Sequence, residues 1–122
     1  PMSSKNTELG RQGEAAAADF LRKIGYKIIC VDYRTPLGQV DIIARDKGTV
    51  CFIEVKSRSS DKFGMPQEAV GRIKQEKISR AAAVFLKNNG LLESRARFDV
   101  VSVQWPGAKP EIELIRDAFN CR

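Results

Sequence analysis

Hydrophobic and polar residues alternate along this chain with two different periods, which predict helices and strands. Apolar residues at helical spacing predict one helix over residues 8–24, with Thr7 as its N-cap, and a second over residues 66–88. Runs rich in β-branched residues predict the strands. They cover residues 26–33, 40–46, 49–56, 97–105 and 111–116.

The order of these elements predicts an α/β fold. A helix, three strands, a second helix, a strand and a last strand form an αβββαβ core, with a central mixed sheet flanked by helices. We interpret residues 2–122 as one domain, and Pro1, which precedes Met2, as a remnant of cloning.

The most informative stretch is residues 38–58, which the pattern predicts to be a hairpin with a turn at Lys47-Gly48. If Asp46 pairs with Thr49, then Asp41 lies opposite Glu54, and Gln39 lies opposite Lys56. Directly opposed residues share one face of a sheet, and Lys56 shares that face with Glu54 because it is two residues further along the strand.

Two opposed carboxylates repel each other unless a cation lies between them. Asp41, Glu54 and Lys56 therefore indicate a metal site beside an ammonium, which is the equipment for hydrolysing a phosphodiester. The alternative is a half-exposed strand with alternating charge. The apolar residues on both sides of the charges favour a buried strand, where unpaired charge is costly.

The amino-acid composition limits the kinds of catalytic site and partner that this chain can have. The chain lacks histidine, which excludes Ser-His-Asp and Cys-His catalysis and His-ligated zinc, and favours a hard cation held by oxygen ligands. The net charge of +6 favours a polyanionic partner such as nucleic acid, although ordinary solubility also explains it.

The cysteines and the hydropathy of the chain indicate where in the cell the protein is located. Three cysteines without C-x-x-C spacing indicate buried thiols in a reducing environment. No apolar run reaches membrane-spanning length and no signal peptide is visible, so we expect a cytoplasmic protein without a membrane partner.

Basic residues cluster in sequence after the hairpin. We expect nucleic-acid contacts from Arg58, Lys62, Arg72, Lys74 and Lys77, and residues 57–66 form a polar loop suited to a substrate-contacting role. Lys74 and Lys77 fall within the apolar stripe of the second helix. Either this half of the helix faces a charged groove, or the lysines reach water along their stems.

Several segments, spread in order over residues 10–119, resemble one known family. They include Gly10-x-x-Gly13-Glu14, residues 38–44, Phe52-Ile53-Glu54-Val55-Lys56-x-Arg58, residues 97–101 and residues 117–119. The chain resembles the YraN-like uncharacterised bacterial family of the restriction-endonuclease-like superfamily, whose mark is the PD-(D/E)-x-K motif. It is more distantly similar to archaeal Holliday-junction resolvases.

The resemblance implies a nuclease-like fold and a metal-dependent endonuclease acting on DNA, including branched DNA. Asp41, Glu54 and the Val55 carbonyl would hold Mg²⁺ or Mn²⁺, with Glu14 binding directly or through water. Lys56 would orient the attacking water. On spacing alone Glu14 is a boundary glutamate in solvent, and only the resemblance makes it a site residue.

Two departures accompany the resemblance. Val40 stands where the motif name has proline, and Gln39 stands where the family typically has glutamate. The alternatives are a non-catalytic nucleic-acid-binding module and a protein-interaction domain, for which the sequence has no distinctive feature. A homodimer would fit a symmetric junction, but the sequence does not indicate one.

Overall fold

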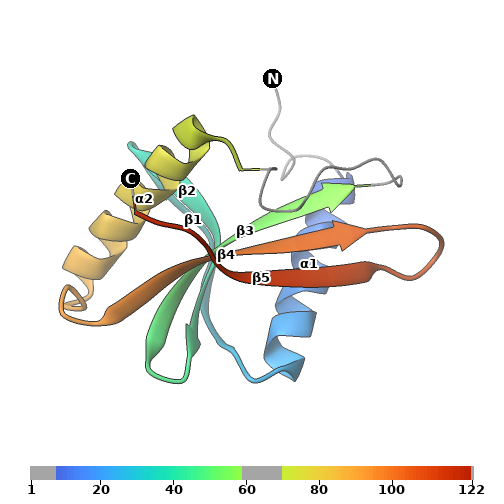
Figure 1. The fold of residues 1–122 in the computed structure, drawn as a ribbon, viewed down its shortest axis with the longest axis horizontal. Coiled ribbons are helices and arrows are strands. Elements are labelled where there is room, and N and C mark those ends of the chain that lie inside the picture. The colour runs from blue at the N-terminus through green and yellow to red at the C-terminus, as the bar shows by residue number, and fades with distance from the viewer. Residues whose placement is uncertain (1–7, 59–69, 122) are drawn as a thin grey trace.

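A computed structural model describes residues 8–58 and 70–121, which form two helices and a five-stranded sheet (Figure 1). The mixed α/β architecture predicted from the sequence is confirmed. In chain order the elements are α1 (Glu8–Lys23), β1 (Lys27–Thr35), β2 (Gly38–Asp46), β3 (Thr49–Arg58), α2 (Arg72–Asn88), β4 (Arg95–Gln104) and β5 (Glu111–Phe119).

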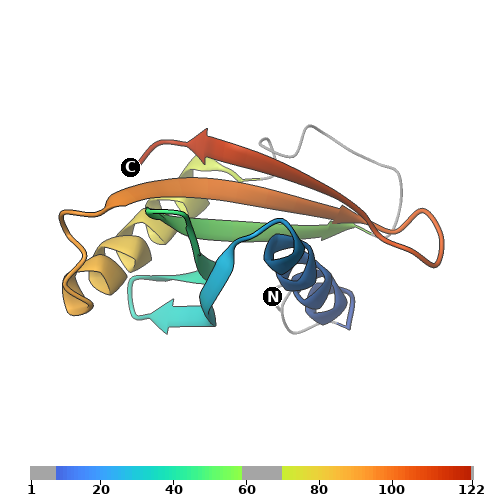
Figure 2. The same ribbon diagram turned by 90° about the horizontal axis from the view of Figure 1, so that it is seen from below.

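The strands lie in the sheet in the same order as in the chain, from β1 to β5. Figure 2 shows this order from β5 at the top of the view to the β1–β2 hairpin at the bottom. Strands β3 and β4 are parallel, and every other neighbouring pair is antiparallel. The connection between two parallel strands must cross a face of the sheet, and here it contains α2.

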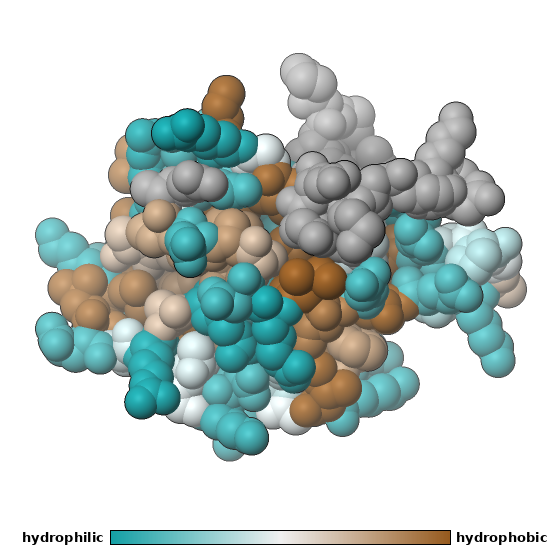
Figure 3. Space-filling model, viewed as in Figure 1, coloured by the Kyte–Doolittle hydropathy of each residue, from teal (hydrophilic) through white to brown (hydrophobic). Residues whose placement is uncertain are grey.

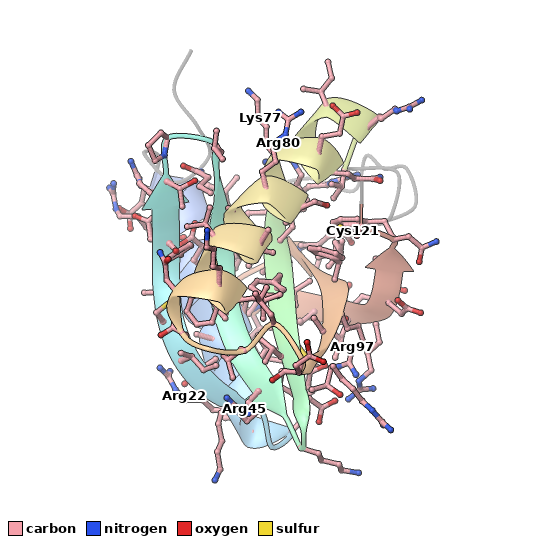
Figure 4. The ribbon with its side chains drawn as sticks, turned by 90° about the vertical axis from the view of Figure 1, so that its left-hand side faces the viewer. Arg22, Arg45, Lys77, Arg80, Arg97 and Cys121 are labelled. Atoms are coloured by element: carbon pink, nitrogen blue, oxygen red, sulfur yellow. The ribbon has the colours of Figure 1, made fainter. Side chains whose placement is uncertain are left out.

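The two helices cover opposite faces of the sheet, as Figure 4 shows with α2 in front and α1 behind. Alternate residues of β3 divide between the two cores. Ile53 and Val55 pack with α1, whereas Val50 and Phe52 pack with α2. This double burial explains why β3 is apolar on both faces, as the sequence predicted.

Several element ends differ from the prediction, among them those of α2, β3 and α1. Helix α2 begins at Arg72 rather than at Pro66, since Val70 and Gly71 are not helical. Strand β3 continues to Arg58, so the first two residues of the predicted polar loop belong to the sheet. Helix α1 ends one residue early, before Gly25, whose positive φ of 103° suits a helix stop.

Some predictions fall outside the described residues. Thr7 as N-cap, the loop over residues 59–66 and the first predicted turn of the second helix are among them.

A buried ionic network joins the start of β4 to the connection between α1 and β1, to the β2–β3 turn and to β5. Asp99 is fully buried and accepts hydrogen bonds from Tyr26, from the guanidinium of Arg97 and from the backbone N–H of Asp117. Arg97 also pairs with Asp46 at 2.9 Å. Every oxygen of Asp99 has a donor, so this network holds the sheet together at the end opposite the β1–β2 turn.

Candidate functional site

The β2–β3 hairpin has the register that the sequence predicts. Asp46 pairs with Thr49, and the pairing continues to Ile42 and Ile53. Lys47 adopts a left-handed backbone with φ of 57°, which makes the tight turn possible. The next position along both strands is occupied by the two acidic residues, Asp41 and Glu54.

Asp41 is a buried carboxylate, with 4% of its surface exposed. Its Oδ2 atom accepts a hydrogen bond of 2.8 Å from the backbone N–H of Val55. The side chain therefore satisfies a backbone donor of β3 one residue beyond Glu54. This contact fixes Asp41 against β3.

Glu54 is equally buried, with 3% of its surface exposed, and two ammonium groups approach it. The Nζ atom of Lys74 on α2 lies 2.5 Å from its Oε2 atom, and Nζ of Lys56 lies 3.8 Å from the same oxygen. Burial and the nearby charge of Asp41 raise the pKa of Glu54 to about 7. Loss of hydration disfavours a buried carboxylate, and a second negative charge adds to that cost.

This environment shifts the pKa values of the two lysines in opposite directions. Burial, together with the charge of Lys74, lowers the pKa of Lys56 despite the attraction of Glu54. Burial also acts to lower the pKa of Lys74, but the carboxylates of Glu54 and Asp41 outweigh it, so its pKa is raised. Lys74 is thus held as the cation that neutralises the acidic pair.

Glu14 comes from the helix on the other face of the sheet. Gly13 beside it lets α1 approach β3 closely, because a Cβ atom at Gly13 would lie within 2.8 Å of Cβ of Ser57. The charge of Glu14 contributes to raising the pKa of Arg34, after the stronger effect of Asp32, so Glu14 lies within electrostatic reach of Arg34.

Within residues 8–58 and 70–121, no three Asp, Glu, Cys or His side chains come together closely enough to enclose a metal ion. The structure therefore joins Asp41, Glu54 and Lys56 but does not add Glu14 to them. The part of Glu14 as a third ligand stays a prediction.

The residues predicted to bind nucleic acid have different surroundings. Lys77 lines a cavity of about 630 Å³ together with Lys74. Arg72 pairs with Glu76 on the exposed side of α2, and Arg58 ends β3. Lys62 lies outside the described residues.

For Lys74 the structure decides between the two interpretations of its place in the apolar stripe. Its ammonium pairs with the buried carboxylate of Glu54 while 41% of its side chain stays exposed, so the first half of α2 faces a charged groove. Ile73 is 70% exposed, which agrees with this, although its spacing along the helix predicts a buried position.

The β1–β2 turn contributes to the site, which the predicted strand bounds did not include. Thr35 pairs with Gly38 across Pro36-Leu37, and the Thr35 hydroxyl accepts hydrogen bonds from the backbone N–H groups of Leu37 and Gly38. The Pro-Leu-Gly sequence was an available turn signal. Gln39 pairs with Arg34 of β1 in this hairpin, and both residues line the same cavity as Lys74.

Two further sequence expectations can be compared with the structure. All three cysteines are free, and Cys51 is buried, Cys30 is half-buried and Cys121 is exposed. Across residues 8–58 and 70–121, neither helix has the length and apolar character needed to cross a membrane.

These observations define a mixed α/β protein with a buried pair of carboxylates and two lysines at one end of its sheet. Residues 13–103 match the model of a family described as "Uncharacterised protein family UPF0102". The chain belongs to this family, as the resemblance to the YraN-like proteins predicted.

Relatives with the same family name cover almost the whole chain. A UPF0102 protein of Desulfosudis oleivorans is 50% identical over 119 residues, which cover 98% of this chain and 95% of the relative. One of Syntrophus aciditrophicus is 47% identical, with 96% and 92% covered. One of Geobacter metallireducens is 44% identical, with 98% of both chains covered.

Proposed function

We propose that this protein is a metal-dependent endonuclease that hydrolyses phosphodiester bonds of DNA at Asp41, Glu54 and Lys56. The observation that carries the proposal is the burial of two neighbouring carboxylates beside two ammonium groups. A protein that only binds nucleic acid gains nothing from buried acids, because they repel phosphate. Acids in such a place are typical of a site that works with a bound cation.

The donor set suits a hard divalent cation such as Mg²⁺ or Mn²⁺. Asp41 and Glu54 supply carboxylate oxygens, and burial together with the charge of Asp41 raises the pKa of Glu54 although Lys74 and Lys56 lie beside it. The Val55 carbonyl and Glu14 are the proposed additional ligands. A cation bound there would polarise the scissile phosphate and lower the pKa of a water ligand.

Side chains and backbone groups of the protein itself would supply the other functions of the site, which are to orient the water and to hold Asp41 in place. Lys56 lies on the same face of β3 as Glu54, and its partly exposed ammonium can donate hydrogen bonds to the attacking water and to a phosphate oxygen. A protonated lysine cannot accept a proton, so we assign Lys56 an orienting and electrostatic part. The hydrogen bond from Val55 to Asp41 fixes the orientation of that carboxylate.

The fold agrees with a restriction-endonuclease-like assignment, which we also propose. The element order, the parallel β3–β4 pair and the carboxylates at adjacent positions of β2 and β3 are the features that support it. Fold alone does not establish activity, so the assignment supports the site argument without replacing it.

A cleavage assay tests the proposal. The protein is incubated with labelled duplex, flap, single-stranded and four-way-junction DNA in Mg²⁺, Mn²⁺ or EDTA. We expect cleavage that requires the metal and is lost in Asp41→Asn. The exposed Glu93→Gln variant carries the same change in charge and should cleave normally. Cleavage that survives in Asp41→Asn would place the activity elsewhere or in a contaminant.

The second candidate is a nucleic-acid-binding module without catalysis. Its support is the Lys74–Glu54 pair, in which a side chain already supplies the positive charge that a metal would bring. This alternative predicts salt-dependent binding that is independent of divalent metal, with no cleavage of any substrate in the assay.

A further inference from the structure

A groove lies between the β1–β2 turn and the first turns of α2, with a volume of about 630 Å³. We call it the hairpin–helix groove. Arg34, Leu37 and Gln39 line it from the hairpin, and Ile73, Lys74 and Lys77 line it from the helix. Figure 4 shows Lys77 extending from α2 at the end of the sheet that carries the β1–β2 turn, whereas Arg22 and Arg45 lie at the other end.

The groove is cationic and leads to the carboxylate site. Three of its described lining residues are Arg or Lys, and none is acidic. Lys74 both lines the groove and pairs with Glu54, so one side chain connects the wall of the groove to the buried acidic pair. A strand bound in the groove would lie next to that pair.

Two of the three cations of the groove, Arg34 and Lys77, are available to a ligand. Arg34 pairs with Asp32 at 3.0 Å, but both side chains are largely exposed. Ion pairs between exposed side chains add little stability, so a phosphate can replace Asp32 at little cost. Lys77 is also exposed and lies one helical turn from Lys74.

Large apolar side chains stand in this same groove, one on each wall. Leu37 is 53% exposed and Ile73 is 70% exposed. Figure 3 shows hydrophobic surface next to strongly hydrophilic surface over the start of α2. Fully paired DNA keeps its base faces stacked, so these side chains could not contact a base face and could reach only edge groups such as the thymine methyl. Apolar side chains inserted among bases contact steps that have come unstacked.

We propose that the hairpin–helix groove holds an unpaired nucleotide next to the phosphate that is cleaved. Arg34 and Lys77 bind the flanking phosphates, and Leu37 and Ile73 pack against the face of the base. This inference rests on the proposed nuclease function and narrows its substrate to nucleic acid with unpaired bases at the cleavage position. Continuous duplex is then a poor substrate.

Binding in EDTA tests the groove without requiring catalysis. Fluorescence anisotropy compares a continuous duplex with a duplex that carries a short central bubble of unpaired bases. We expect the wild-type protein to prefer the bubble, and the double variant Leu37→Ser/Ile73→Ser to lose about tenfold in affinity for it. The duplex should bind both proteins equally. Leu92→Ser is the control, since Leu92 is 64% exposed beyond the other end of α2.

The salt dependence of DNA binding tests the cationic side chains of the groove. Lys77→Ala should reduce the salt dependence of binding by about one ion, and Lys87→Ala, in the last turn of α2, should not. The fluorescence of a 2-aminopurine base in the bubble should differ between the wild-type and double-variant complexes, because the base packs against Leu37 and Ile73 only in the wild-type complex.

The outcomes separate this inference from the nuclease proposal. Bubble preference that depends on Leu37 and Ile73 supports the groove, even if no metal-dependent cleavage is found. Metal-dependent cleavage without any bubble preference leaves the nuclease standing and overturns the groove. Equal loss of affinity for both DNAs in the double variant would also overturn it. Unchanged binding of both DNAs in the double variant would overturn it as well, because the two apolar side chains would then contact neither DNA.

Discussion

Lys74 Nζ lies 2.5 Å from Glu54 Oε2, so an ammonium group of α2 neutralises a carboxylate buried in the sheet. The pair couples the helix to the site, because Lys74 also lines the hairpin–helix groove. A bound divalent cation would compete with Lys74 for the same oxygen. Whether Glu54 pairs with Lys74 or with a cation should therefore affect how α2 is held against the sheet.

The first prediction concerns stability in the absence of metal. The pKa of Glu54 is raised in the folded state, so the folded protein binds this proton more tightly than the unfolded chain. The contribution of Glu54 to stability is fully present below about pH 4.5 and is lost as the pH rises through about 7. Glu54→Gln should remove that loss.

Urea unfolding in EDTA measures this effect. We expect Glu54→Gln to be more stable than the wild-type protein at pH 8, by as much as roughly 3 kcal/mol, and to show little gain at pH 4.5. Glu93→Gln, on an exposed residue, should shift stability little at either pH. A wild-type protein whose stability relative to Glu54→Gln does not change with pH would contradict the raised pKa.

Lys56 should matter for cleavage but not for folding or metal binding. Its ammonium is partly exposed and approaches only one oxygen of Glu54, at 3.8 Å. Lys56→Met should reduce the cleavage rate by about 100-fold or more, as expected when one hydrogen-bond donor to a developing charge is removed. Lys87→Met, at the far end of α2, is the matched control. An active Lys56→Met would remove the lysine from the proposed mechanism.

Gly38 allows α2 to approach the β1–β2 turn. A Cβ atom at this position would lie within 2.7 Å of the backbone carbonyl carbon of Lys77, and backbone cannot rotate away as a side chain can. Gly38→Ala should destabilise the protein by roughly 1–3 kcal/mol or more and weaken binding in the groove. Gly107→Ala is the control, because its Cβ would meet nothing within 4 Å. Thermal unfolding of both variants checks this.

The hairpin register could be predicted because it depends on local sequence. The turn at Lys47-Gly48 and the alternation of two strands were enough to bring Asp41 and Glu54 to neighbouring positions. The surroundings of Lys74 could be narrowed to two alternatives from the sequence. A lysine in an apolar stripe faces either a charged groove or, along its stem, the solvent. Only the packing of α2 against β2 decides between these.

Other features depend on contacts between distant segments, which local patterns do not contain. The hydrogen bond from Val55 to Asp41 replaces the simple opposition of side chains that the register suggested. The Asp99 network joins residues as far apart in sequence as Tyr26 and Arg116, so no local pattern announces it. The groove likewise needs the hairpin turn and α2 together.

The Asp99 network yields a prediction about the opposite end of the sheet. Asp99→Asn replaces a fully buried carboxylate that accepts from Arg97 and Tyr26, and leaves the charge of Arg97 without that partner. Removing one partner of a buried ion pair costs roughly 3–5 kcal/mol. Denaturant unfolding should show this loss, whereas Asp19→Asn on the exposed side of α1 should change little. A loss below about 1 kcal/mol would mean that the network adds little to stability.

The most direct test of the central claim, that Asp41 and Glu54 hold a divalent cation, is a calorimetric titration of the metal-free protein with Mn²⁺. We expect binding that is lost in Asp41→Asn, kept in Glu93→Gln, and weaker by roughly tenfold at pH 6 than at pH 8, because protons compete for Glu54. Absence of Mn²⁺ binding, or binding that Asp41→Asn leaves intact, would contradict the account.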